Sequence, residues 1–317
     1  SSSARLGKSN WCILELDESD GSFLEVPPTY SIITNLDAEH LDYYKSLKNL
    51  KSHFLKFINN TPSFGKCFIC IDNKNNKSLI SKITNKNFST YGFNYKSNFK
   101  IYNVKQNTHF SKFDIQVNLP NIKKKIIKNI EIPLIGHHNI SNATAALAIA
   151  YSIGIPNSVI KKGLKHFKGV ERRFNYLFKY RNSIFIDDYA HHPTEITEVL
   201  KGVKEVYSKK EIICIFQPHR ISRLQTLANE FSKSFLNAHK VVLCPIFKAG
   251  ENIKLKINYT NFAKKIIKNS KVELININNQ IELYKYIKQC IFDESIIIGM
   301  GAGSISTWMR EMPKNIK

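Results

Sequence analysis

Short apolar runs alternate with longer polar or amphipathic stretches along the carboxy-terminal half of the chain. Each run has the length of a buried strand, and each intervening stretch is long enough for a covering helix. The predicted strands are residues 184–186, 212–216, 241–243, 272–277 and 296–298, and helices are predicted from Pro193, from about Ser222 and near Leu283. This alternation predicts an α/β fold in which helices cover both faces of a parallel sheet.

The amino-terminal half has a less regular pattern. Apolar residues predict buried strands at residues 11–16, 31–34 and 68–71, and helices at residues 44–57, 143–150 and from Ile155 to near Phe167. The Asn- and Lys-rich stretch between Asp72 and Ile130 predicts an antiparallel strand extension without catalytic residues. Residues 169–174 then separate two predicted domains, residues 1–168 and 169–317.

Length and composition agree with two domains in a reducing compartment. The chain has 317 residues, 43% of them hydrophobic, which is enough for two domain cores. It has no run of about eighteen apolar residues and no apolar leader, so we predict a cytoplasmic protein without a membrane partner. Most of the six cysteines lie in apolar, strand-like runs. Cys67 and Cys70 have C-x-x-C spacing, but strand geometry explains it better than a redox or zinc role.

The formal net charge of +22 comes from lysines scattered among Asn and Ile through the whole chain. No basic patch with interleaved aromatic residues stands out, so we expect a solvated surface and no nucleic-acid partner. A surface of this charge would steer anionic substrates such as nucleotides toward the protein.

The densest group of polar side chains follows the predicted strand 184–186, within residues 187–195. Two carboxylates, a phenol and two imidazoles lie between that strand and Pro193, which suits the first turn of a helix. Ligands of open α/β sheets bind where strands end and helices begin, so we expect the chemistry at this turn. The alternative is an ordinary polar loop in which Asp188 or Thr194 caps the helix.

Glu18 and His40 each follow a predicted strand of the amino-terminal half. Parallel strands would bring both side chains to the same edge of a sheet. A carboxylate and an imidazole at that edge can share a divalent cation, and phosphate-bound Mg²⁺ suits Glu18. In the alternative, Glu18 caps a helix and His40 packs against its neighbours.

Two further pairs of residues could bind a nucleotide or an anion. Asn139 and Asn142 share the amino-terminal face of a predicted helix, and their amides offer the donor and acceptor that an adenine edge requires; a plain Asn N-cap is the alternative. Arg220 and Arg223 on one face of a helix start could clamp phosphate or carboxylate, unless they are surface arginines. Residues 299–303 resemble a dinucleotide loop, but no ribose-binding acid follows, which predicts a tight turn.

Together these residues resemble the Mur ligase family. The matching runs are residues 17–20, 34–35, 40–42, 136–139, 142–143, 172–174, 187–195 and 216–220, with Arg223 and residues 301–303. They span nearly all of the chain in family order. The runs D-D-Y-A-H-H-P and F-Q-P-H-R together point to the branch that uses L-alanine. The resemblance implies a partial central ATPase-type domain with a parallel sheet, followed by a carboxy-terminal Rossmann-like α/β domain.

The resemblance implies an ATP-dependent amide ligase. The carboxylate of UDP-N-acetylmuramate would first be phosphorylated, and the amine of L-alanine would then attack the acyl phosphate. The implied site residues are Glu18 and His40 for Mg²⁺, Asn139 and Asn142 for adenine, Arg173 for the ATP phosphates, Asp188 for the ribose, Tyr189 and His191 for the incoming alanine, and His219, Arg220 and Arg223 for anionic substrate oxygens. Cations, Mg²⁺ and a carboxylate are the groups that two phosphate-bearing substrates and a ribose diol require.

Two features depart from the family pattern. The family's domain that binds the UDP sugar has no counterpart in this sequence. The G-x-x-G-K-[ST] phosphate loop has none either, because Gly7, Lys8 and Ser9 lack the upstream glycine spacing. The modified lysine that bridges Mg²⁺ in some members is not assigned, since Leu55 stands in that neighbourhood. We therefore expect the chain to be a fragment that does not ligate by itself.

Two other functions are compatible with these motifs. A related ligase attaches a recycled peptide to UDP-muramate and would need a wider pocket around Tyr189 and His191. A non-catalytic nucleotide-binding module is the second alternative, because a chain without a phosphate loop has no obvious means of activating the γ-phosphate. The sequence assigns no oligomeric state.

Overall fold

The computed structural model describes residues 4–120, 123–254, 256–291 and 294–316. Of Asp42 it describes the backbone alone. The chain forms two compact units. The first comprises Ser1–Tyr102, Ile115–Ile127 and Thr144–Ile155, and the second comprises Asn103–Asp114, Lys128–Ala143 and Pro156–Lys317. Two segments before residue 156 therefore group with the carboxy-terminal part, and a single domain boundary between residues 168 and 169 stays a prediction.

A six-stranded sheet forms in the amino-terminal half, in the order β1-β2-β3-β4-β5-β6. Its strands are β1 (Tyr30–Ile33), β2 (Lys66–Cys70), β3 (Phe88–Gly92), β4 (Phe99–Gln106), β5 (Ser111–Val117) and β6 (Lys125–Ile132). Strands β1 to β4 pair in parallel. The strands predicted at residues 31–34 and 68–71 are confirmed as β1 and β2.

Short helices accompany this sheet. They are η1 (Ser22–Glu25), α1 (Leu41–Tyr44), α2 (Leu47–Asn59), α3 (Lys74–Leu79) and η2 (Ile80–Lys82). Helix α2 begins after Ser46, whose hydroxyl accepts the backbone N–H of Asn49. The predicted helix at residues 44–57 therefore starts later than expected, because Lys45 has a φ of 64° and ends α1. Apolar residues of η1, β1, β2 and α2 form one core cluster.

Two helices follow β6 in the chain, α4 (His137–Ser152) and α5 (Asn157–Lys165). Both confirm helices predicted from apolar spacing. Within the part of the chain that the structure describes, no helix is both long and apolar enough to cross a membrane.

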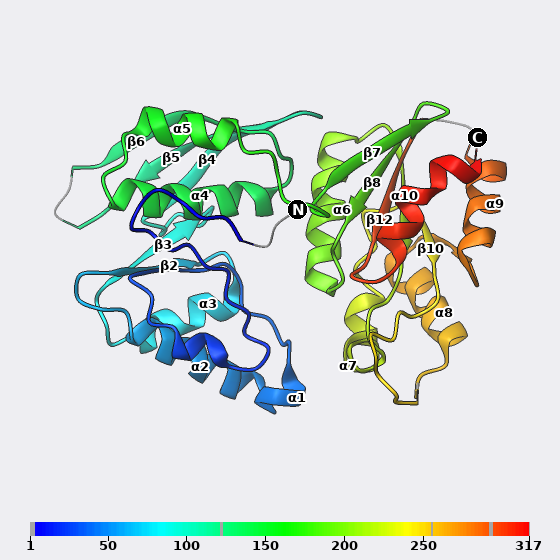
Figure 1. Ribbon diagram of the computed structural model, residues 1–317, viewed down its shortest axis with the longest axis horizontal. Helices are drawn as coiled ribbons and strands as arrows, with labels where there is room; N and C mark the ends of the chain where they lie inside the picture. Colours follow the sequence, from blue (N-terminus) through cyan, green and yellow to red (C-terminus); the bar gives the residue numbers. More distant parts are fainter. Residues whose placement is uncertain (1–3, 121–122, 255, 292–293, 317) are drawn as a thin grey trace. The chain divides into compact units, whose positions relative to one another are not determined.

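The second unit contains a sheet of six strands in the order β11-β10-β9-β12-β8-β7 (Figure 1). The strands are β7 (Asn175–Tyr180), β8 (Ser183–Asp188), β9 (Glu211–Phe216), β10 (Lys240–Leu243), β11 (Glu273–Asn276) and β12 (Ser295–Met300). All neighbours are parallel except β7 and β8. The predicted α/β class and the predicted strands β8 to β12 are confirmed, whereas β7 was not predicted.

Helices cover both faces of this second sheet (Figure 1). Helices α6 (Pro193–Val206), α7 (Ile221–Phe231) and α8 (Tyr259–Ser270) contribute to the core on one face, and α9 (Gln280–Cys290) and α10 (Ile305–Ile316) to the core on the other. Successive residues of β9 alternate between the two cores: Ile212 and Cys214 belong to the first, Ile213 and Ile215 to the second. A strand buried on both faces is therefore apolar throughout, which made it predictable.

The carboxyl ends of three neighbouring strands of this sheet stop at the same level. Met300, the last residue of β12, pairs with Asp188 of β8 on one side and with Phe216 of β9 on the other. The segments that follow these strands therefore leave the sheet at one edge, where parallel α/β sheets bind their ligands. The backbone N–H of Gly301 donates to the carbonyl of Asp188. Gly299 and Met300 belong to β12, so the tight turn predicted for residues 299–303 can begin only at Gly301.

The buried strand predicted at residues 11–16 was wrong. These residues have no secondary structure, and Ile13 and Leu14 are 93% and 59% exposed. An apolar run forms a strand only where a neighbour accepts its backbone hydrogen bonds. In the described sheet, β1 pairs with β2 alone, so residues 11–16 add no strand to it.

Two further features of the chain differ from the sequence prediction. Strand β3 is parallel to both neighbours, although its stretch was predicted to be antiparallel. Helix α3 in the same stretch was not predicted; the side chain of Asn73 caps it by accepting the backbone N–H groups of Asn75 and Asn76. The prediction for most of the cysteines is confirmed, since Cys67, Cys70, Cys214 and Cys244 are buried, whereas Cys12 and Cys290 are exposed.

Candidate active site

Asp188 ends β8, and its carboxylate holds the turn that follows. Oδ1 accepts the backbone N–H of Ala190 and Oδ2 that of Phe174, each at 2.8 Å. The residue is 2% exposed, and burial raises the pKa of Asp188 to about 6 although both hydrogen bonds favour the carboxylate. Both oxygens thus have partners within the protein, and the ribose contact of Asp188 stays a prediction.

His192 caps helix α6, so neither Asp188 nor Thr194 does. The Nδ1 of His192 accepts the backbone N–H of Thr194 at 3.4 Å. Glu195 reaches back in return, because its Oε2 accepts the backbone N–H groups of His191 at 2.9 Å and His192 at 3.2 Å. This reciprocal arrangement is a capping box, and it fixes the path of the chain between β8 and α6.

Glu195 also joins two predicted site residues. Its Oε1 lies 3.1 Å from Nη1 of Arg173, and its Oε2 lies 3.4 Å from Nδ1 of His191. Burial by itself would raise the pKa of Glu195, but the charge and backbone N–H of His191 and the charge of Arg173 lower it. The carboxylate is therefore ionised at neutral pH.

Aromatic rings from two strand ends form a row at this edge of the sheet. The ring of His191 lies 5.1 Å from that of Tyr189 and 5.8 Å from that of His219, edge to face in both cases. The guanidinium groups of Arg172 and Arg173 lie 4.6 and 5.4 Å from the centre of the Tyr189 ring. The structure thus brings together residues that were predicted for the alanine, the phosphates and the anionic oxygens.

His219 lies in the turn after β9 and is held by two neighbours. Its Nδ1 is 3.2 Å from Nη1 of Arg223, and its ring stacks on Phe247 with 5.6 Å between centroids. Burial, and then the charge of Arg223, lower the pKa of His219 to about 4. The ring is neutral at pH 7, so any contact with an anionic oxygen would be a hydrogen bond from a ring N–H rather than an ion pair.

Arg220 and Arg223 do not share a helix face, which corrects the predicted clamp. Arg220 precedes α7 with a φ of 68°, and its backbone N–H donates to the carbonyl of Phe247 at 2.8 Å. The helical spacing of three residues therefore does not apply across Arg220. Arg220 is exposed and Arg223 is half-buried. Their individual roles as ligands stay predictions.

Asn139 and Asn142 lie inside helix α4, which begins at His137, so neither is the N-cap that was the alternative. The amide of Asn139 donates to the carbonyl of Ile135 at 2.8 Å, and Asn142 is exposed. Their contact with adenine stays a prediction.

Close backbone packing precedes α4 and places His138. Gly136 has a φ of 92°, and a Cβ there would come within 2.9 Å of Nδ1 of His138. A Cβ on Gly202 of α6 would in turn lie 2.9 Å from Cα of Gly136. Burial, and then the charge of Arg173, lower the pKa of His138 to about 4. His138 is therefore a neutral packing residue beside the Arg173 and Glu195 pair.

In the first unit, Glu18 and His40 lie together as predicted. The Nε2 of His40 is 3.7 Å from Oε1 of Glu18 and 3.6 Å from Oε2 of Glu39. These three side chains place their ligand atoms within 4.8 Å of one another, a donor set that fits a divalent cation. Glu18 caps no described helix, since Gly21 precedes η1 and His40 precedes α1.

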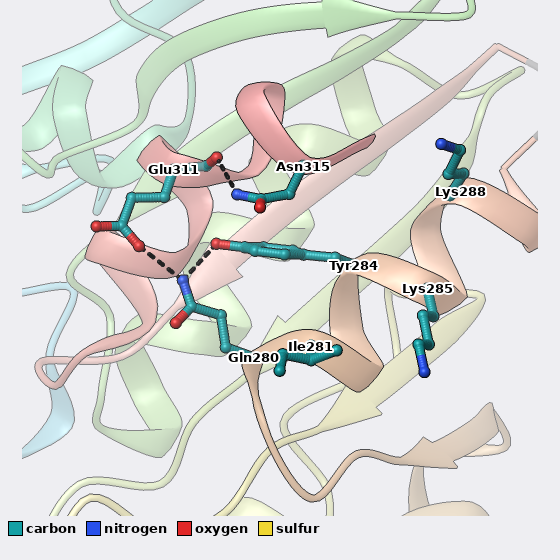
Figure 2. Close-up of a pocket in the computed structure, with 7 residues that line it drawn as sticks. All are labelled: Gln280, Ile281, Tyr284, Lys285, Lys288, Glu311 and Asn315. Carbon is teal, nitrogen blue, oxygen red and sulfur yellow. Dashed lines mark hydrogen bonds between the residues drawn. The ribbon is translucent and has the colours of Figure 1, made fainter. Parts of the chain in front are cut away.

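A cavity of about 430 Å³ lies between α9 and α10 (Figure 2). Gln280 donates to Glu311 at 2.8 Å, and the hydroxyl of Tyr284 donates to the carbonyl of Trp308 at 2.9 Å. The ammonium groups of Lys285 and Lys288 point away from each other. Its lining includes none of the predicted site residues, and its polar groups do not converge on a ligand position.

Sequence reasoning gave no role to Glu195, Arg172 or Glu39. The signal for Glu195 was available, because a Glu three residues after a polar residue that precedes a helix is the pattern of a capping box. Arg172 and Glu39 each adjoin a residue that had been assigned a role. Their side-chain positions depend on the turns around them, which no local pattern specifies.

Two family models match the chain. Residues 3–150 match the Mur ligase middle domain, and residues 172–303 match the Mur ligase, glutamate ligase domain.

Several similar proteins are named UDP-N-acetylmuramate–L-alanine ligases. The UDP-N-acetylmuramate–L-alanine ligase of Pelagibacter ubique is 60% identical over 314 residues, which are 99% of this chain and 68% of that protein. A solved UDP-N-acetylmuramate-alanine ligase from Thermotoga maritima is 28% identical, with a TM-score of 0.73, over 94% of this chain and 62% of that one. A murein peptide ligase from Psychrobacter arcticus is 19% identical, with a TM-score of 0.64, over 93% and 58%. The chain spans about two thirds of the length of the curated relatives it matches.

Proposed function

The chain belongs to the Mur ligase family, and from this premise we propose that it acts in the ATP-dependent ligation of L-alanine to UDP-N-acetylmuramate. This reaction is a step of peptidoglycan precursor synthesis. The observation that carries the proposal is the 60% identity, across 99% of the chain, to the alanine ligase of Pelagibacter ubique. The nucleotide substrates support the cytoplasmic location predicted from the sequence.

The proposed reaction has two steps. A carboxylate oxygen of the muramyl group attacks the γ-phosphorus of ATP, which gives an acyl phosphate and ADP. The amine of L-alanine then attacks the acyl carbon, phosphate leaves with the transferred oxygen, and the nitrogen loses a proton as the amide forms. The protein must therefore bind several phosphate charges, orient the amine and accept one proton.

His191 is our candidate for the proton acceptor. Burial lowers the pKa of His191 below its ordinary value, although Glu195 opposes the shift, so the ring is neutral at pH 7. Its Nδ1 lies 2.9 Å from the carbonyl oxygen of Tyr189. With the ring hydrogen donated to that carbonyl, Nε2 is the basic atom, and a neutral imidazole is suited to take a proton from the attacking amine.

The anionic groups would be met by arginines and by a cation. Arg173 and Arg223 flank the row of rings at the sheet edge and would hold phosphate or carboxylate oxygens. Glu18 and His40 would hold Mg²⁺, with Glu39 beside them. When bound, Mg²⁺ neutralises phosphate charge during phosphoryl transfer.

The nucleoside would be held by amides and by a carboxylate. We assign the adenine edge to Asn139 and Asn142 and the ribose to Asp188. The oxygens of Asp188 each accept one backbone N–H, but a carboxylate has about four lone-pair sites in total, so it can accept a further hydrogen bond from a ribose hydroxyl.

The two alternatives have weaker support. The likeness to the murein peptide ligase of Psychrobacter arcticus, at 19% identity, supports the fold alone. A non-catalytic module would not need the ionised carboxylate, the neutral imidazoles and the arginines to lie together at one sheet edge.

A chimera tests the proposal. The 314 matched residues of the Pelagibacter ubique ligase would be replaced by this chain, and the product would be measured with ATP, Mg²⁺, UDP-N-acetylmuramate and L-alanine. We expect phosphate release that depends on L-alanine, and a loss of it in the Arg173→Ala chimera. A folded chimera that prefers a recycled peptide to L-alanine, or that forms no product with either, would contradict the proposal.

A further inference from the structure

One carboxylate in the candidate site has two different sets of partners. Oε1 of Glu195 faces the guanidinium of Arg173 at 3.1 Å. Oε2 faces the imidazole of His191 at 3.4 Å and accepts the backbone N–H groups of His191 and His192. Each oxygen therefore serves a different segment, one the residues before β7 and the other the turn after β8.

We propose that Glu195 is a positioning residue, which fixes the guanidinium of Arg173 and the imidazole of His191 relative to each other. The inference rests on the proposed function for what these two residues bind, a nucleotide phosphate and the amine of L-alanine. Glu195 itself need not touch either substrate. It acts through the residues that do.

A helix cap alone does not account for these contacts. A capping box uses the carboxylate of the third helical residue to accept the backbone N–H of the N-cap residue, and Oε2 does this for His192. The Oε1 contact with Arg173 adds nothing to the cap. Arg173 also lies over the Tyr189 ring at 5.4 Å. Its side chain is therefore restricted by two partners, Glu195 of α6 and Tyr189 of the turn that precedes this helix.

The position of the carboxylate has a measurable electrostatic consequence at His191. The charged and titratable groups around this imidazole are Tyr189 of the β8–α6 turn, Glu195 of α6, His219 of the β9–α7 turn, Arg223 of α7, and Arg173 before β7. Burial lowers the pKa of His191, Glu195 raises it, and Arg223 and Arg173 lower it. Loss of the Glu195 charge should thus lower this pKa further, and loss of the Arg173 charge should raise it.

The first test needs no substrate and uses the 317-residue chain. The pKa of His191 would be measured by NMR titration of the chain labelled at its histidines, in the native protein, in Glu195→Gln and in Glu198→Gln. Glu198 is a matched control, since it lies one turn further along α6 and no described hydrogen bond or ion pair joins it to Arg173 or His191. We expect the pKa of His191 to fall in Glu195→Gln, because an opposite charge is lost, and to stay unchanged in Glu198→Gln.

A second variant keeps the test decisive if Glu195→Gln fails to fold. Arg173→Met leaves the cap intact and should raise the pKa of His191. If Glu195→Gln folds, the effect of Arg173→Met should be smaller in the double variant than in the native background, because the shared carboxylate is gone. An unchanged pKa of His191 in either Glu195→Gln or Arg173→Met, or an equal fall in Glu198→Gln, would overturn the proposal.

The functional test uses the chimera described above. Glu195→Gln should raise the KM for ATP and the KM for L-alanine together, since it releases both Arg173, assigned to the phosphates, and His191, assigned to the amine of L-alanine. The control Glu198→Gln should leave both KM values within about twofold. A fall in the KM for ATP would show that the carboxylate competes with phosphate for Arg173, which contradicts a positioning role. An inactive native chimera would count against the proposed function, while the NMR result would still decide the role of Glu195.

Discussion

Replacement of Asp188 by Asn should change how the stability of the second unit depends on pH. The side chain is 2% exposed, and burial raises the pKa of Asp188 from 3.8 to about 6. Ionisation of this carboxyl is therefore less favourable in the folded than in the unfolded protein. Its contribution to stability is fully present below pH 3.8 and is lost as the pH rises through about 6.

The size of this effect follows from the two pKa values. The difference between 3.8 and about 6 corresponds to about 3 kcal/mol. Asn has nearly the same shape but does not titrate. It retains only one acceptor oxygen, so its NH2 group would face one of the two N–H donors, that of Ala190 or that of Phe174. The loss of this hydrogen bond costs about 1–3 kcal/mol at every pH. Relative to the native protein, the Asn variant should therefore gain about 3 kcal/mol in free energy of unfolding from about pH 4 to about pH 7.5.

Urea denaturation followed by tryptophan fluorescence can measure this gain. The chain has two tryptophans, and a Trp11→Phe background leaves Trp308 of α10 as the only one, so the signal reports the second unit. Native and Asn proteins would be compared at closely spaced pH values. A difference between them that is constant with pH, or that moves against the Asn variant as the pH rises, would refute the buried-carboxyl argument.

Three other perturbations probe packing, the acceptor side and the cation site. Gly202→Ala should destabilise the second unit by about 1–3 kcal/mol, because its Cβ would meet Cα of Gly136 at 2.9 Å. Gly163→Ala, whose Cβ would have nothing within 4 Å, should stabilise its helix by about 0.5–1 kcal/mol. Equal shifts of the melting temperature in the two variants would contradict the close packing at Gly202. His191→Ala should raise the KM for L-alanine more than that for ATP in the chimera, and equal effects would make its role structural. Glu18→Gln should weaken Mn²⁺ binding measured by EPR in the chain itself, and an unchanged affinity would remove Glu18 from the site.

The sequence predicted the second sheet well for a physical reason. Strands β8, β9, β10 and β12 are buried on both faces, so each is a continuous apolar run bounded by polar turns. Strand β11 lies at one edge of the sheet and has no fully buried residue, but its central Leu274 and Ile275 still gave an apolar signal. Strand β7 escaped prediction because it is antiparallel at the sheet edge and only partly buried. Residues 11–16 show the opposite error, since an apolar run without a partner strand looks the same in sequence as one that has a partner.

The candidate site was predictable in its location but not in its internal contacts. Parallel pairing brings the carboxyl ends of β8, β9 and β12 to one edge of the sheet, and polar residues follow each strand. The two carboxylate oxygens of Glu195 contact different residues, Arg173 and His191. The contact with Arg173 depends on the tertiary packing of the segment before β7. Likewise, the φ of 68° at Arg220 breaks a helical spacing that the sequence alone would continue. Local patterns place residues on elements, whereas side-chain partners depend on how the elements pack.

The transfer of oxygen from substrate to phosphate tests the central claim most directly. The chimera would be supplied with UDP-N-acetylmuramate labelled with ¹⁸O in its carboxylate, together with ATP, Mg²⁺ and L-alanine, and both products would be analysed by mass spectrometry. The account predicts UDP-N-acetylmuramoyl-L-alanine and released phosphate that carries one ¹⁸O atom, because the carboxylate oxygen leaves with the phosphoryl group. Amide product with unlabelled phosphate would contradict the acyl phosphate route, and the absence of amide product would contradict the alanine ligase assignment.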